Sequence, residues 1–262
     1  MTPAQILHTF ARRTCIDRFS FWIAEYEPLV LSGQDRDGYY YTDEACNIFP
    51  RYNVLRSTLM EIEKIDFDKL PDLPTLFEVL ANVGQLGNVE LGRERQTLIA
   101  SEARADELQK FRDTIASFDP TSEESIEPLF YRRVLSESED ERFWEKLDQH
   151  WGRGSTGYWY PMSAKTHPTL TFRSLEDVDY EIMISRIEKF LSTLKTSRIF
   201  ELRENGESFE QEKDGIEFFY NGAEGYWFDN SMAWVVYCSH ENTITMGGVI
   251  AHVLDGFPQT IW

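Results

Sequence analysis

The sequence predicts an α+β fold, in which a helical N-terminal half precedes a mostly antiparallel sheet with covering helices. Apolar residues recur at helical spacing through roughly the first 118 residues. After Thr196 they alternate at every second residue, which is the period of a strand. Helices followed by strands are typical of the α+β class. The chain has 262 residues, of which 42% are hydrophobic and 14% aromatic, so it can form packed cores.

Four helices are expected in the N-terminal half. The first begins at Thr2-Pro3-Ala4-Gln5, which has the form of a capping box with proline in the first turn. Pro50 marks the start of the second helix or a kink before it. Asp72 begins the third helix and Gly84 ends it, and the fourth runs from about 93 to 117. The later apolar stripes are Leu55, Leu59 and Ile62, then Leu76, Phe77, Leu80 and Val83, then Leu108, Phe111 and Ile115.

A polar stretch from Asp119 to Glu124 separates the two halves. It contains a proline near its start, which is typical of a boundary between domains. We therefore expect a helical region over 1–118 and an α+β domain over 119–262. One continuous domain is the alternative.

Two further helices are expected after the boundary. Ser138 and Glu141 form a capping box for the first, which reaches Trp151. Ser174 with Asp177 begins the second. Its stripe is the clearest helical pattern in the chain and consists of Met183, Ile187, Phe190, Leu191 and Leu194.

Strand patterns fill the C-terminal part of the chain. Phe200 and Leu202 alternate with charged residues, as do the apolar residues of 216–220, and Asn205-Gly206 predicts a hairpin turn between these two runs. The run 234–238 is apolar at every position, so we expect a strand buried on both faces.

The chain then closes with a turn, a strand and a short helix. Ser239 to Asn242 predicts the turn, Thr243 to Met246 the strand, and Val249 to Leu254 the helix. Two similar aromatic runs, 157–160 and 225–228, are expected to be strands with aromatic residues facing inward.

The chain is strongly acidic, with 45 acidic and 26 basic residues and a net charge of −19. Such a field repels nucleic acid and anionic membrane surfaces and attracts cationic partners. Solubility alone also explains a charge of this sign. No apolar run approaches the roughly 18 residues of a membrane span. Three widely spaced cysteines favour reduced thiols in a cytoplasm over a disulfide framework.

Motifs for metal or cofactor binding are incomplete. The segment 33–44 resembles a calcium loop, with Asp35, Asp37 and Glu44 at ligand positions, but Gly33 stands where the first carboxylate is needed. A turn after a helix is the simpler interpretation. Cys238, His240, Glu241 and His252 lack the spacing of known zinc motifs. We expect no metal and no cofactor.

Basic patches are also missing from the sequence. Arg12-Arg13 and Arg132-Arg133 are isolated pairs, which we interpret as surface residues that form salt bridges.

Two acidic clusters are the candidate binding features. The first covers Glu123, Glu124, Glu127, Glu137, Glu139, Asp140 and Glu141, and the second covers Glu201, Glu204, Glu207, Glu210, Glu212, Asp214 and Glu217. Each is a solvated face or a binding face. Exposed aromatic residues beside such carboxylates would suit a partner rich in lysine and arginine. The candidate partner-binding residues are Glu207, Glu210, Glu212, Asp214, Tyr226, Trp227, Asp229, His240 and Glu241.

The C-terminal runs Glu224 to Asp229 and Trp234 to Ile244 resemble a pattern in small acidic bacterial proteins, some of them of the immunity type. The resemblance implies a cytoplasmic protein without enzymatic activity that neutralises a toxin by covering it. It supplies no catalytic residues, and the helical N-terminal half lies outside it.

The sequence thus favours a cytoplasmic, non-enzymatic protein that binds a basic protein, with an immunity role as its most concrete form. The alternative is a hydrolase with a cleft between the two halves. In that case His240, Glu241 and His252 should meet Cys238 or Asp229 in a concave pocket.

Overall fold

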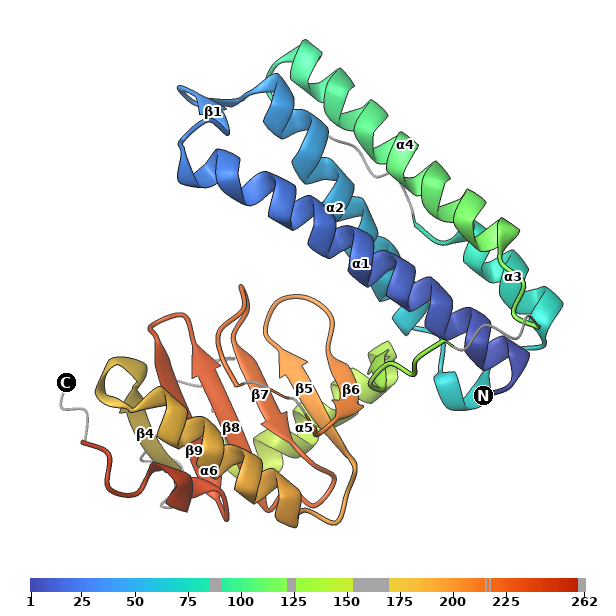
Figure 1. Ribbon diagram of the computed structural model, residues 1–262. Helices are drawn as coiled ribbons and strands as arrows, with labels where there is room; N and C mark the ends of the chain where they lie inside the picture. The colour runs from blue at the N-terminus through green and yellow to red at the C-terminus, as the bar shows by residue number, and fades with distance from the viewer. Residues whose placement is uncertain (85–90, 122–125, 153–169, 215, 217, 259–262) are drawn as a thin grey trace. The chain divides into compact units, whose positions relative to one another are not determined.

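The computed structural model describes residues 1–84, 91–121, 126–152, 170–214, 216 and 218–258 (Figure 1). Their contacts divide the chain into two compact units, Met1–Leu129 and Phe130–Trp262. The predicted boundary at residue 119 lies ten residues before the end of the first unit. The architecture is α+β, as predicted, with the helices of the first unit preceding an antiparallel sheet in the second.

Four α-helices make up most of the described part of the first unit. They are α1 (Pro3–Leu31), α2 (Asp43–Glu63), α3 (Leu73–Asn82) and α4 (Glu94–Ser117). A short hairpin of β1 (Arg36–Asp37) and β2 (Tyr40–Tyr41) joins α1 to α2, and the 3₁₀ turn η1 (Phe67–Lys69) precedes α3.

Local capping explains where these helices begin. Thr2 and Gln5 form the predicted capping box, with the Gln5 backbone N–H donating to Thr2 Oγ1 at 3.3 Å. Asp72 accepts a hydrogen bond from the Thr75 backbone N–H at 3.0 Å, as expected at an N-cap. Pro50 does not start the second helix, because α2 begins earlier, at Asp43, and continues through the proline.

The predicted apolar stripes form the core of the first unit. Its buried residues are Leu7, Ala11, Cys15, Val54, Leu55, Ile62, Leu76, Leu80, Val83, Leu108, Phe111 and Ile115. Charged groups are buried in the same bundle, since Arg12 of α1 and Glu63 of α2 are 4% and 1% exposed and form an ion pair at 2.9 Å. Glu107 of α4 is fully buried and binds Arg18 and Arg51.

The second unit is a seven-stranded sheet with the order β3-β6-β5-β7-β8-β9-β4, and each of its described pairings is antiparallel. The strands are β3 (Arg132–Val134), β4 (Leu170–Ser174), β5 (Arg198–Arg203), β6 (Phe209–Glu212), β7 (Gly225–Phe228), β8 (Trp234–Ser239) and β9 (Thr243–Gly248). Its helices are α5 (Glu137–Trp151) and α6 (Tyr180–Thr193), with 3₁₀ turns η3 (Leu175–Asp177) and η4 (Ala251–Leu254).

Helices cover both faces of this sheet (Figure 1). The predicted stripe of α6 packs with Trp234, Val236 and Cys238 of β8 on one face. On the other face, α5 packs with Val235 and Tyr237. The prediction that this strand is buried on both faces is therefore confirmed.

The predicted hairpin partner of β5 is wrong. The strand after Asn205-Gly206 is Phe209–Glu212 rather than 216–220. Polar residues alternate with Phe209 in β6, so the sequence gives this strand little apolar signal. Phe218 is buried nonetheless, packed 5.4 Å from the ring of Trp227.

The starts of α5 and α6 differ from the predictions. The capping box of α5 uses Ser136 and Glu139 instead of Ser138 and Glu141, because the pattern occurs twice, two residues apart, and Arg133 binds the Glu139 carboxylate at 2.8 Å. Ser174 caps η3, whereas Asp179 caps α6. Strands β3 and β4 were not expected. The aromatic run 157–160 and the residues Glu123, Glu124 and Glu217 lie outside the described residues.

Candidate functional site

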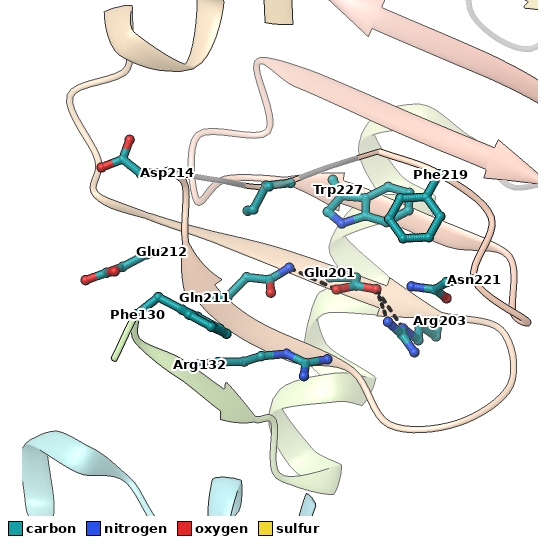
Figure 2. A pocket seen from close by; sticks show the side chains of 11 residues that line it. Phe130, Arg132, Glu201, Arg203, Gln211, Glu212, Asp214, Phe219, Asn221 and Trp227 are labelled. Atoms are coloured by element: carbon teal, nitrogen blue, oxygen red, sulfur yellow. Dashed lines mark hydrogen bonds and ion pairs between the residues drawn. The ribbon is translucent and has the colours of Figure 1, made fainter. Parts of the chain in front are cut away.

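A pocket with a volume of about 350 Å³ lies in the second unit, over β5, β6 and β7 (Figure 2). It opens on the face of the sheet that carries α6, because Trp227 belongs to the core on that side. Its lining residues are Phe130, Arg132, Glu201, Arg203, Gln211, Glu212, Asp214, Ile216, Phe219, Asn221 and Trp227.

Strand register places Arg132, Glu201 and Gln211 on one face. Arg132 of β3 is opposite Gln211 of β6, and Glu201 of β5 is opposite Trp227 of β7. Residues opposite one another in an antiparallel pair share a face. Trp227 lies over Gly225, where a Cβ atom would come within 2.5 Å of the indole, so glycine is needed here.

A buried carboxylate organises the interior of the pocket. Glu201 is 4% exposed and accepts hydrogen bonds from Arg203 Nε at 2.6 Å and from Gln211 Nε2 at 2.9 Å. The guanidinium carbons of Arg132 and Arg203 lie 3.7 and 5.1 Å from the ring centre of Phe209. The pocket therefore combines a paired carboxylate with two guanidinium groups.

Figure 2 shows how the remaining side chains lie. Arg132, Glu201 and Arg203 converge, whereas the carboxylates of Glu212 and Asp214 point away from them. The aromatic part of the lining includes Trp227, which is buried, and two exposed rings, Phe130 and Phe219.

A second polar site lies where β7 begins and β8 ends, and consists of Glu204, Glu224 and Glu241, here termed the carboxylate cluster. The hydroxyl of Tyr226 donates to Glu204 at 2.6 Å, and the hydroxyl of Tyr237 donates to Glu224. These two tyrosines are opposite one another in β7 and β8, with ring centres 4.7 Å apart.

His240 completes this site from the turn after β8. Its Nδ1 atom binds the Glu224 carboxylate, and its side chain is 63% exposed. The hydrogen bond to Glu224 and the charges of Glu224, Glu241 and Glu204 raise the pKa of His240 above its ordinary value. Burial, followed by the hydrogen bond to Glu224, raises the pKa of Tyr237. The Tyr237 hydroxyl therefore remains a donor at neutral pH.

The nine predicted binding residues divide between several places. Glu212, Asp214 and Trp227 line the pocket. Tyr226 contacts the carboxylate cluster, to which Glu241 belongs, and His240 binds it.

Three predicted residues belong to neither site. Glu210 pairs with Arg133 at 2.8 Å, Asp229 accepts from the Ser231 backbone N–H at 2.8 Å in a turn, and Glu207 lies between β5 and β6.

The expectation that the aromatic residues of 225–228 face inward in a strand is confirmed, because Tyr226 and Trp227 are 0% and 2% exposed in the inner strand β7. The alternative use of these two rings as exposed contacts for a partner is therefore wrong, and so is one expectation about a carboxylate. Glu201, expected on a solvated or binding face, is buried beneath the pocket.

The residues of the hydrolase alternative are not brought together. His240 follows β8, whereas His252 lies in η4 beyond the far end of β9, so the histidines flank opposite ends of this hairpin. Cys238 is fully buried, and burial raises the pKa of its thiol, which keeps it protonated. Within the described ranges, no three His, Cys, Asp or Glu side chains are grouped so as to hold a metal ion.

The polar pocket residues that the sequence did not reveal are Arg132, Arg203, Gln211 and Asn221. Arg132-Arg133 looked like a surface pair, but a strand sends consecutive side chains to opposite faces. Arg132 consequently lines the pocket, while Arg133 binds Glu139 and Glu210 on the other face. The sequence signal that could have identified these residues is the alternation of charged with apolar residues in β5 and its neighbouring strands, which indicates that the charged residues share one face.

Comparisons with known proteins found no matching family model, no matching curated protein and no matching solved structure. In the part of the chain that the structure describes, none of the helices is both long and apolar enough to cross a membrane.

Proposed function

We propose that this protein is a non-enzymatic binding protein that recognises a basic protein partner through the carboxylate cluster. The observation that carries the proposal is the convergence of Glu204, Glu224 and Glu241 on one end of the sheet. The Glu204 backbone N–H donates to the Glu224 backbone carbonyl at 3.0 Å, and the charges of Glu224, Glu241 and Glu204 all raise the pKa of His240, so the three carboxylates make one region of negative charge.

The cluster has features that suit a protein interface. Tyrosine hydroxyls orient two of its carboxylates, which lowers the cost of fixing them when a lysine or arginine binds. Tyr220 is 40% exposed, and its ring centre lies 6.3 Å from that of His240. Aromatic residues beside charged groups are common at interfaces.

The most concrete form of this function is an immunity-type protein that covers a bacterial toxin in the cytoplasm. This form rests on the resemblance of the C-terminal runs, which include Glu224, Tyr226, Tyr237, His240 and Glu241. The three cysteines are free and buried, which fits a reducing compartment. Neutralisation by covering requires a surface and no catalytic group.

The test begins with capture of the partner from a lysate of the native host, followed by binding kinetics at low and high salt. Steered association of opposite charges should slow strongly with added salt, while dissociation changes less. The variant Glu224→Gln with Glu241→Gln should lower the association rate. Glu210 is left unchanged, because Arg133 already neutralises it.

The matched control is Glu141→Gln with Glu145→Gln on the exposed face of α5, which removes the same charge elsewhere. If both double variants lowered the association rate equally, the binding would depend on net charge alone and not on the carboxylate cluster. An acidic partner, or an association rate indifferent to salt, would contradict the proposal altogether.

A further inference from the structure

The chain contains two Asn-Gly steps, at 205–206 and 221–222, and both lie in loops beside the carboxylate cluster. We propose that Asn205 and Asn221 are sites of spontaneous deamidation, which adds a carboxylate to the cluster at each of them as the protein ages. This inference deepens the proposed function, on which its consequence for binding rests, because it names a change of charge at the same site. The chemistry itself needs no partner.

Strand pairing brings the two steps to one end of the sheet. Strand β5 pairs with β7, and just beyond this pairing the Glu204 backbone N–H donates to the Glu224 carbonyl oxygen at 3.0 Å. Asn205 follows Glu204 directly in the chain, and Asn221 lies three residues before Glu224. Either deamidation would therefore place a new negative charge within a few residues of a carboxylate of the cluster.

Both steps are accessible to the reaction. Asn205, Gly206, Asn221 and Gly222 are all exposed, and no described residue accepts a hydrogen bond from the backbone N–H of either glycine. The two glycines have φ values of +107° and +97°, and no heavy atom beyond their chain neighbours lies within 4 Å of the place where a Cβ atom would stand. Because glycine lets the backbone rotate more freely than other residues do, its nitrogen can approach the side chain before it.

The reaction needs only water and balances without an oxidant or a reductant. The deprotonated backbone nitrogen of the glycine attacks Cγ of the asparagine, and the side-chain nitrogen leaves as ammonia with the proton that the backbone nitrogen lost. Water then opens the succinimide ring. Cleavage between the ring nitrogen and Cγ gives aspartate, and cleavage between that nitrogen and the backbone carbonyl carbon gives isoaspartate. Either product is negative at neutral pH, because a carboxyl group replaces the amide.

The first experiment incubates the full chain at physiological temperature and pH and follows each asparagine by peptide mapping. Deamidation raises the mass of a peptide by about 1 Da, and chromatography separates the isoaspartate form. Asn242 is the internal control, because it is exposed in a turn with a φ of +57° but is followed by Thr243. We expect Asn205 and Asn221 to react at least about tenfold faster than Asn242, since a β-branched side chain crowds the attacking nitrogen.

Two double variants test whether the new charges belong to the cluster. Asn205→Asp with Asn221→Asp has the charge of the product. Gln149→Glu with Asn230→Asp is the matched control, because it adds the same charge at exposed positions in the last turn of α5 and in the turn after β7. That turn lies at the opposite end of β7 from Glu224. Thermal midpoints of both variants establish that each is folded.

His240 reports the charge of the cluster in both variants. Its pKa is raised first by the hydrogen bond to Glu224 and further by the charges of the cluster, Glu204 included. The ring centre of Tyr220, which precedes Asn221, lies 6.3 Å from that of His240. Two-dimensional NMR should show a higher titration midpoint for His240 in the aspartate variant than in the unmodified chain. The rise should be at least about twice that in the control, because coulombic interactions weaken with distance and are screened by salt.

Two outcomes would overturn the proposal. An asparagine of either step that reacts no faster than Asn242 is not a deamidation site. An equal rise of the His240 midpoint in both double variants would show that the new charges do not belong to the cluster. Both readouts are made on the chain alone, so their failure is distinguishable from a failure of the proposed partner binding.

Discussion

At the scale of single residues, Trp234 shows how much one side chain contributes to the sheet domain. It is fully buried, with its ring 5.6 Å from Phe190 of α6 and 6.4 Å from Phe218. We predict that Trp234→Ala lowers the free energy of unfolding by about 3–5 kcal/mol, through lost burial and a residual cavity. Urea denaturation measures the change. Phe219→Ala, at an exposed ring, is the control, and an unchanged midpoint for Trp234→Ala would contradict the prediction.

The pKa values of His8 and His240 should be shifted in opposite directions from the ordinary value of histidine. Burial, together with the charge of Arg12, lowers the pKa of His8 to about 4. The pKa of His240 is raised by its bond to Glu224. Two-dimensional NMR between pH 5 and 9 should therefore show His8 neutral throughout and His240 losing its proton above pH 6.5, the ordinary histidine value.

These shifts have opposite consequences for stability. The contribution of His240 is present below its unfolded pKa of 6.5 and is lost as pH rises through its higher folded pKa. The contribution of His8 is present above 6.5 and is lost as pH falls toward 4. A His8 signal that titrates near 6.5 would show that its burial is incomplete.

At the scale of elements, a buried ion pair joins α1 to α2. Arg12 and Glu63 are almost fully buried, and the Arg12 Nε and Nη2 atoms both donate to Glu63 Oε1. We predict that Glu63→Leu alone costs about 3–5 kcal/mol, because it leaves a buried guanidinium without its carboxylate. The double change with Arg12→Met should cost less than the single one. Chemical denaturation of the three proteins tests this, and a double variant less stable than Glu63→Leu would refute it.

Sequence periodicity predicted the elements whose apolar residues face one side. The stripes of α3, α4 and α6 and the two-faced strand β8 follow from spacing alone, and the caps at Thr2 and Asp72 follow from residues three positions apart. Strand β6 was not predicted, because the two residues on its buried face are Phe209 and the polar Gln211, which give no apolar alternation. Its polar residue is satisfied by Glu201, a partner that only the register of β5 and β6 supplies.

The sites were less predictable than the helices and strands, because they too depend on strand register, which the sequence does not show. His240 and Glu241 were identified as polar residues at a turn, but their association with Glu224 depends on the pairing of β7 with β8. The anionic residues near 207–214 were grouped by their positions in sequence. The structure separates them, since Glu210 turns toward Arg133 while Glu212 and Asp214 lie at the pocket.

At the scale of the whole molecule, the negative charge is shared almost equally by the two units. Residues 1–129 carry 23 acidic and 13 basic residues, and residues 130–262 carry 22 and 13. The acidity is therefore a property of the entire chain. What distinguishes the carboxylate cluster is that its acidic side chains lie near one another. This is why the control for the binding experiment removes equal charge from another surface.

Self-repulsion of this charge should make the stability of both units depend on salt. Exposed charges are screened beyond about 8 Å at physiological ionic strength, whereas buried pairs such as Arg12–Glu63 are screened much less. We predict that raising sodium chloride from about 20 to 300 mM increases the thermal midpoint by a few degrees, because relief of repulsion outweighs the loss of weak surface pairs. Differential scanning calorimetry measures this, with sucrose at equal osmolality as the control for effects unrelated to charge. Since the two units carry similar net charge, their transitions should shift by similar amounts if they are resolved. A midpoint that falls with salt would instead mean that attractive surface pairs outweigh the repulsion, and that the excess of acidic residues is locally compensated in the folded chain.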